Sequence, residues 1–180
     1  LTGEDAPKVI ADIKASVGKT NTEPLFNKKF FKPLLLAFLI AFFNQLSGIN
    51  AIIYFAPKVF EMAGIGREGA LLSTVGIGVM NLIFTIAGWY LIDRFGRRVL
   101  MFIGSVGYIF SLTMIAVSFN STDQSMVVYY VFVFIAAHAV GQGAVIWVFL
   151  SELFPNSIRA SGTSFGSLVH WVFAALIAQV

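Results

Sequence analysis

One stretch of the sequence, FNQLSGINAIIYFAP at residues 43–57, places polar side chains among apolar ones. It holds three carboxamides (Asn44, Gln45 and Asn50) beside a serine, a glycine and a tyrosine. An amide without a partner in hydrocarbon costs several kcal/mol, so each must meet another helix, water or a ligand. Amides both donate and accept, which suits a ligand rich in hydroxyl groups and buries no charge. The stretch therefore predicts a polar cavity, the alternative being amides that only join helices.

The spacing of the amides also predicts a local break in the helix. In an ideal helix Gln45 would project about 140° away from Asn50, since each residue turns the chain by about 100°. Both side chains can face one ligand only if the helix loosens between them. Gly48 lies there and has no side chain to resist unwinding. We expect a break at Gly48, and expect Pro57 to end the helix or to bend its outer end.

The remaining candidates for chemistry are aromatic rings. Trp147 and Trp171 could lie against the apolar face of a sugar ring, although a tryptophan in a membrane helix commonly serves packing or the interface. His138 and His170 are expected to be hydrogen-bonded packing groups. They fall in different apolar segments that contain no carboxylate, and the chain has no cysteine. The sequence thus predicts no catalytic residue, metal site, cofactor or enzymatic activity.

The composition is that of a membrane protein. Of the 180 residues 58% are hydrophobic and only 12% are charged, whereas a soluble domain carries about 25% charged residues. Asp, Glu, Lys and Arg are absent from several windows long enough to span a bilayer. The predicted fold class is all-α integral membrane, with transmembrane helices at about 34–56, 70–92, 99–119, 126–150 and 162–180.

The basic residues predict the orientation and the organisation of the chain. Residues 1–32 hold six lysines, and the turn 93–98 and Arg159 follow on the same side, which positive-inside asymmetry makes cytoplasmic. Residues 1–32 are expected to form a cytoplasmic segment with an amphipathic helix at 3–19. Residues 33–180 are expected to form the membrane domain. This topology explains the net charge of +3 without a nucleic-acid partner.

Several motifs resemble one known family. NQLSGINAIIYFAP resembles the seventh-helix signature of the sugar porter family of the major facilitator superfamily, and DRFGRR at 93–98 resembles its turn between helices eight and nine. GQGAVIWVFLSELFPNSIRA at 141–160 is similar to its tenth helix, and SFGSLVHW to the start of its eleventh. The resemblance implies a major facilitator-type helix bundle of which this chain supplies helices seven to eleven, in the C-terminal half. The N-terminal half of the same transporter would be a required partner.

The resemblance also implies roles for individual residues. Asn44 stands where the family has a glutamine, Phe55 replaces the second tyrosine of the outer gate, and His170 stands where many members have asparagine. Gln142, Ala144 and Ile146 occupy positions where members often have prolines, so a proline-broken tenth helix is not expected. The implied substrate-binding residues are Gln45, Asn50, Asn81, Trp147, Asn44, Trp171 and His170. The implied outer gate is Tyr54 and Phe55, and the implied cytoplasmic charge network is Asp93, Arg94, Arg97, Arg98, Glu152 and Arg159.

The function implied is transport of a monosaccharide, hexose or pentose, across the cell membrane by alternating access. Sugar–proton symport is the expected form because the chain resembles bacterial proton–sugar symporters, but it also resembles glucose facilitators. A transporter-like sugar sensor, which binds without transporting, is the alternative. In either case the lipid bilayer surrounds a multi-pass protein, and protons are a partner only of the symporter.

Overall fold

The computed structural model describes residues 10–11, 24–121 and 124–179. Within these residues every regular element is a helix, and five helical stretches are long and apolar enough to cross a membrane: Lys28–Met62, Arg67–Phe95, Arg97–Phe119, Met126–Glu152 and Arg159–Ala178. The amphipathic helix expected at 3–19 lies outside the described residues except for Ile10 and Ala11, which are helical.

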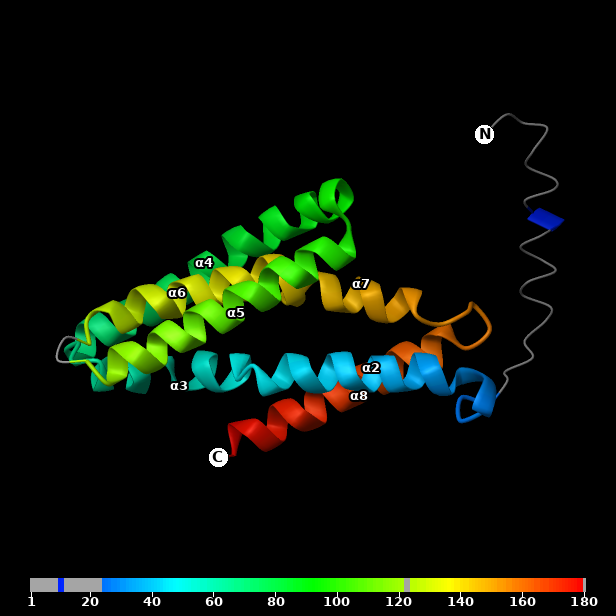
Figure 1. The fold of residues 1–180 in the computed structure, drawn as a ribbon, viewed down its shortest axis with the longest axis horizontal. Helices are drawn as coiled ribbons and strands as arrows, with labels where there is room; N and C mark the ends of the chain where they lie inside the picture. Colours follow the sequence, from blue (N-terminus) through cyan, green and yellow to red (C-terminus); the bar gives the residue numbers. More distant parts are fainter. Residues whose placement is uncertain (1–9, 12–23, 122–123, 180) are drawn as a thin grey trace.

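The spans follow one another back and forth along the length of the bundle (Figure 1). Two of the five are interrupted, and these interruptions matter for the site below. The elements in chain order are η1 (Lys28–Phe30), α2 (Phe31–Leu46), α3 (Ile49–Met62), α4 (Arg67–Phe95), α5 (Arg97–Phe119), α6 (Met126–His138), the π-helix η2 (Ala139–Gly143), α7 (Ala144–Glu152) and α8 (Arg159–Ala178).

The first two spans extend at both ends past the charge-free windows that predicted them. The helix expected at 70–92 begins at Arg67 and continues through Asp93 and Arg94 to Phe95. Charged side chains are tolerated in these end turns because long cationic side chains reach toward the headgroups while their backbone stays helical. The absence of charge therefore indicates the hydrocarbon-facing part of a helix rather than its full length.

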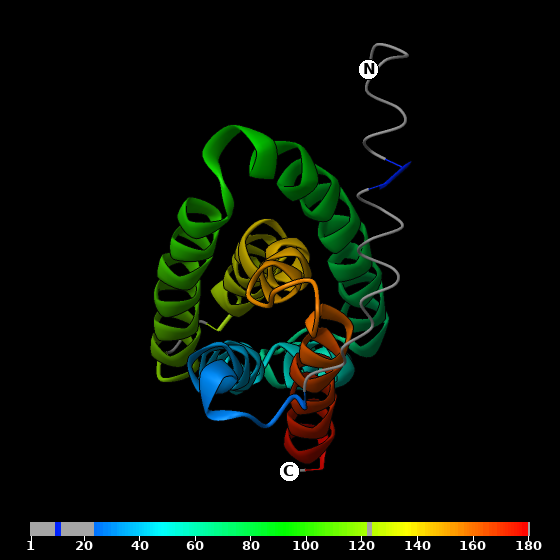
Figure 2. The same ribbon diagram turned by 90° about the vertical axis from the view of Figure 1, so that its right-hand side faces the viewer.

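The fourth span, α6–η2–α7, lies at the centre of the bundle with the other spans around it (Figure 2). Its buried side chains are almost all aliphatic or aromatic, as expected for a helix that is hydrophobic all round. Those exposed by less than 3% include Val127, Val131, Phe134, Ile135, Val145, Ile146 and Leu150. The outer helices instead expose large apolar side chains such as Leu72, Trp89 and Phe102, as a lipid-facing surface does.

Candidate functional site

The first span breaks where the sequence predicted. α2 ends at Leu46 and α3 begins at Ile49, and Gly48 between them has a φ of 78°, in the left-handed region. A residue with a Cβ pays a steric cost there, so glycine suits the position. The break brings Gln45 and Asn50 together, and Asn50 Nδ2 donates to Gln45 Oε1 at 2.7 Å. Pro57 does not end the helix: α3 continues through it to Met62.

The amides form a hydrogen-bonded chain that joins several helices. Gln45 Nε2 donates to Asn44 Oδ1 at 3.0 Å, and Asn44 Nδ2 donates to Gln142 Oε1 at 3.1 Å. Gln142 Nε2 in turn donates to Ser105 Oγ at 3.1 Å. With Asn50, the chain connects α3, α2, η2 and α5. Asn44 and Gln45 are each only 1% exposed, so these bonds satisfy amides that water does not reach.

His170 of α8 joins this chain at Gln45. Gln45 Nε2 lies 3.1 Å from His170 Nδ1 and 3.0 Å from Nε2, so an unprotonated ring nitrogen can accept the second amide hydrogen. The imidazole contacts two indoles, with ring centroids 5.0 Å from Trp147 and 5.2 Å from Trp171. His170 is thus a hydrogen-bonded, buried group, as the sequence led us to expect.

A single π-helical turn brings Gln142 to this chain. Single π turns inside α-helices are rare and occur often at functional sites. Here the turn packs backbone to backbone on α5: a Cβ on Gly104 would lie 2.8 Å from Gly141 Cα, and one on Gly141 would lie 2.6 Å from Gly104 Cα. Ser105 and Gln142 are the next residues along the two helices. The sequence carries no proline at this point, and the span is interrupted by η2.

A cavity of about 230 Å³ lies beside the amides. Its volume is below the roughly 300–1,000 Å³ of most small-molecule sites. Its walls combine amide, imidazole and indole groups with no carboxylate or cation. The lining residues are Asn44, His138, Gln142, Gly143, Ile146, Trp147, His170 and Trp171.

His138, which also lines the cavity, has a hydrogen-bond partner of its own. The Tyr108 hydroxyl is hydrogen-bonded to His138 Nδ1, and the two rings stack with an interplanar angle of 17°. Tyr108 is buried, and it was not among the candidates from the sequence. The same is true of Ser105. Gln142 was noted only for replacing a proline, although an amide between two glycines in an apolar run was a usable signal.

The structure does not bring every expected substrate-binding residue to this cavity. Asn81 is half-buried in α4, lines no part of the cavity and has no hydrogen bond to the residues the structure describes. It lies one turn after Ile77, which packs in one cluster with Val131 of the central span, so Asn81 shares a face of α4 with Ile77. Tyr54 and Phe55 lie on α3 beyond the break and are 57% and 43% exposed.

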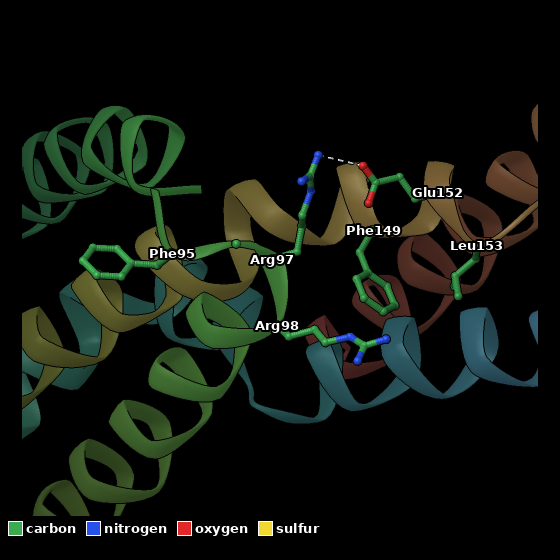
Figure 3. A pocket seen from close by; sticks show the side chains of 7 residues that line it. Phe95, Arg97, Arg98, Phe149, Glu152 and Leu153 are labelled. Carbon is green, nitrogen blue, oxygen red and sulfur yellow. Dashed lines mark ion pairs between the residues drawn. The ribbon is translucent and has the colours of Figure 1, made fainter. Parts of the chain in front are cut away.

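The charged end of the bundle holds a second site, whose charged side chains are more exposed. Arg97 and Glu152 form an ion pair at 2.8 Å, and Figure 3 shows Arg98 extending away from that pair. A pocket of about 510 Å³ lies there between the start of α5 and the end of α7, lined by Phe95, Gly96, Arg97, Arg98, Phe149, Glu152 and Leu153.

The other members of the expected charge network have different contacts. Arg94 lies over the Tyr90 ring, 5.2 Å from its centroid, and Arg159 Nε donates to the Phe154 carbonyl at 3.4 Å. Asp93 is exposed and forms no ion pair with the residues described. Of the six residues expected in the network, one pair is joined in this structure.

Comparison with known proteins identifies the family. The chain matches the family described as "Sugar (and other) transporter" over residues 2–180. It belongs to this sugar transporter family. The resemblance of its motifs to sugar porters is thereby confirmed, and the family is one of transporters rather than enzymes.

Curated sugar transporter relatives include two bacterial symporters. The chain is 36% identical over 149 residues to the arabinose-proton symporter of Bacillus subtilis (strain 168), an alignment that covers 82% of the chain and 32% of the relative. It is 34% identical over 140 residues to the D-xylose-proton symporter of Escherichia coli (strain K12), covering 77% of the chain and 28% of the relative. The chain therefore spans about a third of the length of these relatives.

Solved structures confirm the fold of the sugar transporter chain. The crystal structure of a D-xylose-proton symporter matches it with a TM-score of 0.75 at 29% identity, covering 96% of the chain and 38% of that protein. A proton:xylose symporter of the major facilitator superfamily, solved with 6-bromo-6-deoxy-D-glucose bound, matches with a TM-score of 0.73 at 32% identity, covering 81% and 31%. The chain is thus part of a multi-pass membrane protein with a major facilitator-type helix bundle.

Proposed function

We propose that this chain is part of a transporter that moves a monosaccharide across the cell membrane by alternating access, with a proton as the coupled ion. The observation that carries the proposal is the charge-free amide chain beside a cavity with two indoles. Amides pair with hydroxyl groups in both directions and indoles cover the apolar face of a sugar ring, so this lining suits a neutral sugar. Proton coupling is proposed because the relatives named above are proton symporters.

The proposed sugar contacts are a subset of those expected from the sequence. Asn44, Trp147, His170 and Trp171 line the cavity. Gln45 lies outside the lining and is bonded to Asn44, and Asn50 is bonded to Gln45. Asn81 is the weakest candidate because it lies outside this group. Since the cavity is small, we propose that the N-terminal half of the same transporter completes the site and faces it across the midplane, as in other transporters built from repeated halves.

We also propose roles for residues at the two ends of the transport pathway. Tyr54 and Phe55 are exposed on α3 just beyond the helix break, where movement of α3 would move both rings, so we propose them as the outer gate. The Arg97–Glu152 pair is proposed to close the cytoplasmic end when the site faces outward.

Uptake in proteoliposomes tests the proposal. The full-length protein is reconstituted and uptake of labelled D-xylose, L-arabinose and D-glucose is measured with and without a pH gradient. We expect saturable uptake of at least one sugar, accelerated by the gradient. Gradient-independent uptake would replace the proposed symport with facilitated diffusion. Binding without uptake would instead indicate a sugar sensor.

Substitution of Asn50 tests the site. Asn50→Ala should weaken sugar binding by about 1–3 kcal/mol, since it leaves a ligand hydroxyl and the Gln45 carbonyl without a partner. Asn120→Ala is the matched control, because Asn120 is an exposed amide that donates only to the Ala116 carbonyl. Unchanged affinity in Asn50→Ala would remove Asn50 from the site.

A further inference from the structure

The amide chain runs in one direction from end to end. Each amide donates through its nitrogen to the oxygen of the next, in the order Asn50, Gln45, Asn44 and Gln142. The last donor, Gln142 Nε2, reaches Ser105 Oγ. An amide chain of this kind could run in either direction, because rotating every carboxamide by 180° exchanges its donors and acceptors.

Ser105 decides which direction is used. Its hydroxyl donates to the Met101 carbonyl at 2.8 Å, and a backbone carbonyl can only accept. A hydroxyl has one hydrogen, so Ser105 Oγ can offer only lone pairs to Gln142. Gln142 must therefore present its N–H to Ser105 and its carbonyl to Asn44. Asn44 must then donate to Gln142 and accept from Gln45, and Gln45 must donate to Asn44 and accept from Asn50.

The opposite end of the amide chain, at Asn50, is its more accessible end. Asn50 is half-buried, whereas Asn44 and Gln45 are buried. Asn50 donates one N–H to Gln45 Oε1. No protein group in the described part of the chain donates to Asn50 Oδ1. The direction set at Ser105 thus leaves a carbonyl acceptor free on Asn50.

We propose that Ser105 and Gln142 are positioning residues that set the direction of this chain, so that Asn50 Oδ1 accepts a hydrogen bond from a donating sugar hydroxyl. The inference rests on the proposed sugar-binding function. Ser105 lies outside the cavity, whereas Gln142 lines it; toward Asn50, Gln142 acts through Asn44 and Gln45. The backbone contact between Gly104 and Gly141 holds the two in register.

Deoxy and deoxyfluoro sugars provide the test, since fluorine cannot donate a hydrogen bond. Binding constants of the full-length protein are measured for D-xylose, D-glucose and their monodeoxy and monodeoxyfluoro derivatives. At one hydroxyl position we expect both derivatives to bind about fivefold more weakly than the parent sugar. The difference in affinity between the parent sugar and these derivatives should disappear in Asn50→Ala. The position at which it disappears identifies the hydroxyl that donates to Asn50.

Variants of Ser105 then test the positioning role. Ser105→Ala should reduce the fivefold discrimination at that hydroxyl to less than twofold, and Ser105→Thr, which keeps a hydroxyl, should restore it. Ser111→Ala is the matched control: Ser111 is a buried serine of the same helix that bonds only to backbone carbonyls of its own turn. Full discrimination in Ser105→Ala, or an equal loss of affinity for all derivatives, would overturn the proposal.

A measurement without sugar separates this inference from the proposed function. If wild-type protein binds no sugar, the proposed function fails. Thermal unfolding of Ser105→Ala, Asn50→Ala and the double variant still tests the connection between the two ends. The shifts in Tm should be non-additive, because both substitutions act on one chain of bonds although the residues do not touch. Additive shifts would refute the connection.

Discussion

Polar groups occur at two depths of this bundle, and their surroundings differ. At the centre, neutral amides that are buried (Asn44 and Gln45) or half-buried (Asn50 and Gln142) are bonded end to end from Asn50 to Ser105. At the charged end, Arg97 and Glu152 are 41% and 51% exposed and form a single pair. An unpaired amide away from water costs more than an unpaired charge that water can solvate, so the central groups hold fixed positions and the outer groups need not. The comparison predicts that substitutions among the central amides cause large losses of stability and that substitutions at the charged end cause small ones.

The largest loss of stability is expected at Gln45, where the amide chain branches to His170. Gln45→Ala would leave Asn44 Oδ1, a His170 nitrogen and Asn50 Nδ2 without their partner. The free energy of unfolding should fall by about 3 kcal/mol, since each buried unpaired group costs about 1–3 kcal/mol and water can enter the vacated space. Chemical unfolding in detergent measures it. Gln179→Ala, at the exposed end of α8, is the control, and an equal effect there would contradict the comparison.

The next largest loss of stability is expected where η2 packs against α5. Gly104→Ala would place a Cβ 2.8 Å from the Gly141 Cα, a backbone atom that can move only with its helix. Overpacking of this kind costs about 1–3 kcal/mol of stability, and the shift should also weaken sugar binding by moving Gln142. Thermal unfolding and sugar affinity measure both effects. Gly78→Ala on α4, which meets nothing within 4 Å, should instead be neutral or slightly stabilising.

A smaller effect is expected at the helix break. Gly48→Ala would meet no neighbour within 4 Å, so its cost comes from the left-handed backbone alone, about 1–2 kcal/mol. Gly48→Asn should lose less, because asparagine tolerates this conformation better than alanine. Unfolding of both variants in detergent tests the order. An alanine variant as stable as wild type would show that the break does not depend on the positive φ.

The smallest effect is expected at the charged end. Glu152→Gln should lower stability by about 0–1 kcal/mol, since the pair is exposed to solvent, and the loss should shrink at high salt. A double-mutant cycle with Arg97→Gln measures the pair by itself. A coupling as large as that expected at Gln45 would remove the distinction between the two regions.

The sequence predicted much of this architecture for simple reasons. Charge-free windows of about 20 residues predict membrane helices because hydrocarbon excludes charge over that length. The break at Gly48 followed from the mismatch between the positions of Gln45 and Asn50 and the helical period. The first two spans were predicted too short at both ends, because lack of charge does not report where the backbone stops being helical.

The sequence by itself determined that this chain crosses a membrane repeatedly and carries buried amides that need partners, since both follow from composition and spacing within single helices. Tertiary structure alone decided which partners they have. Ser105 and Gln142 are 37 residues apart, and Asn44 and Gln142 are 98 apart. No helical period relates such positions. The π turn and the contact between Gly104 and Gly141 bring them within hydrogen-bonding distance, because a hydrogen bond requires a contact that only the packed helices provide.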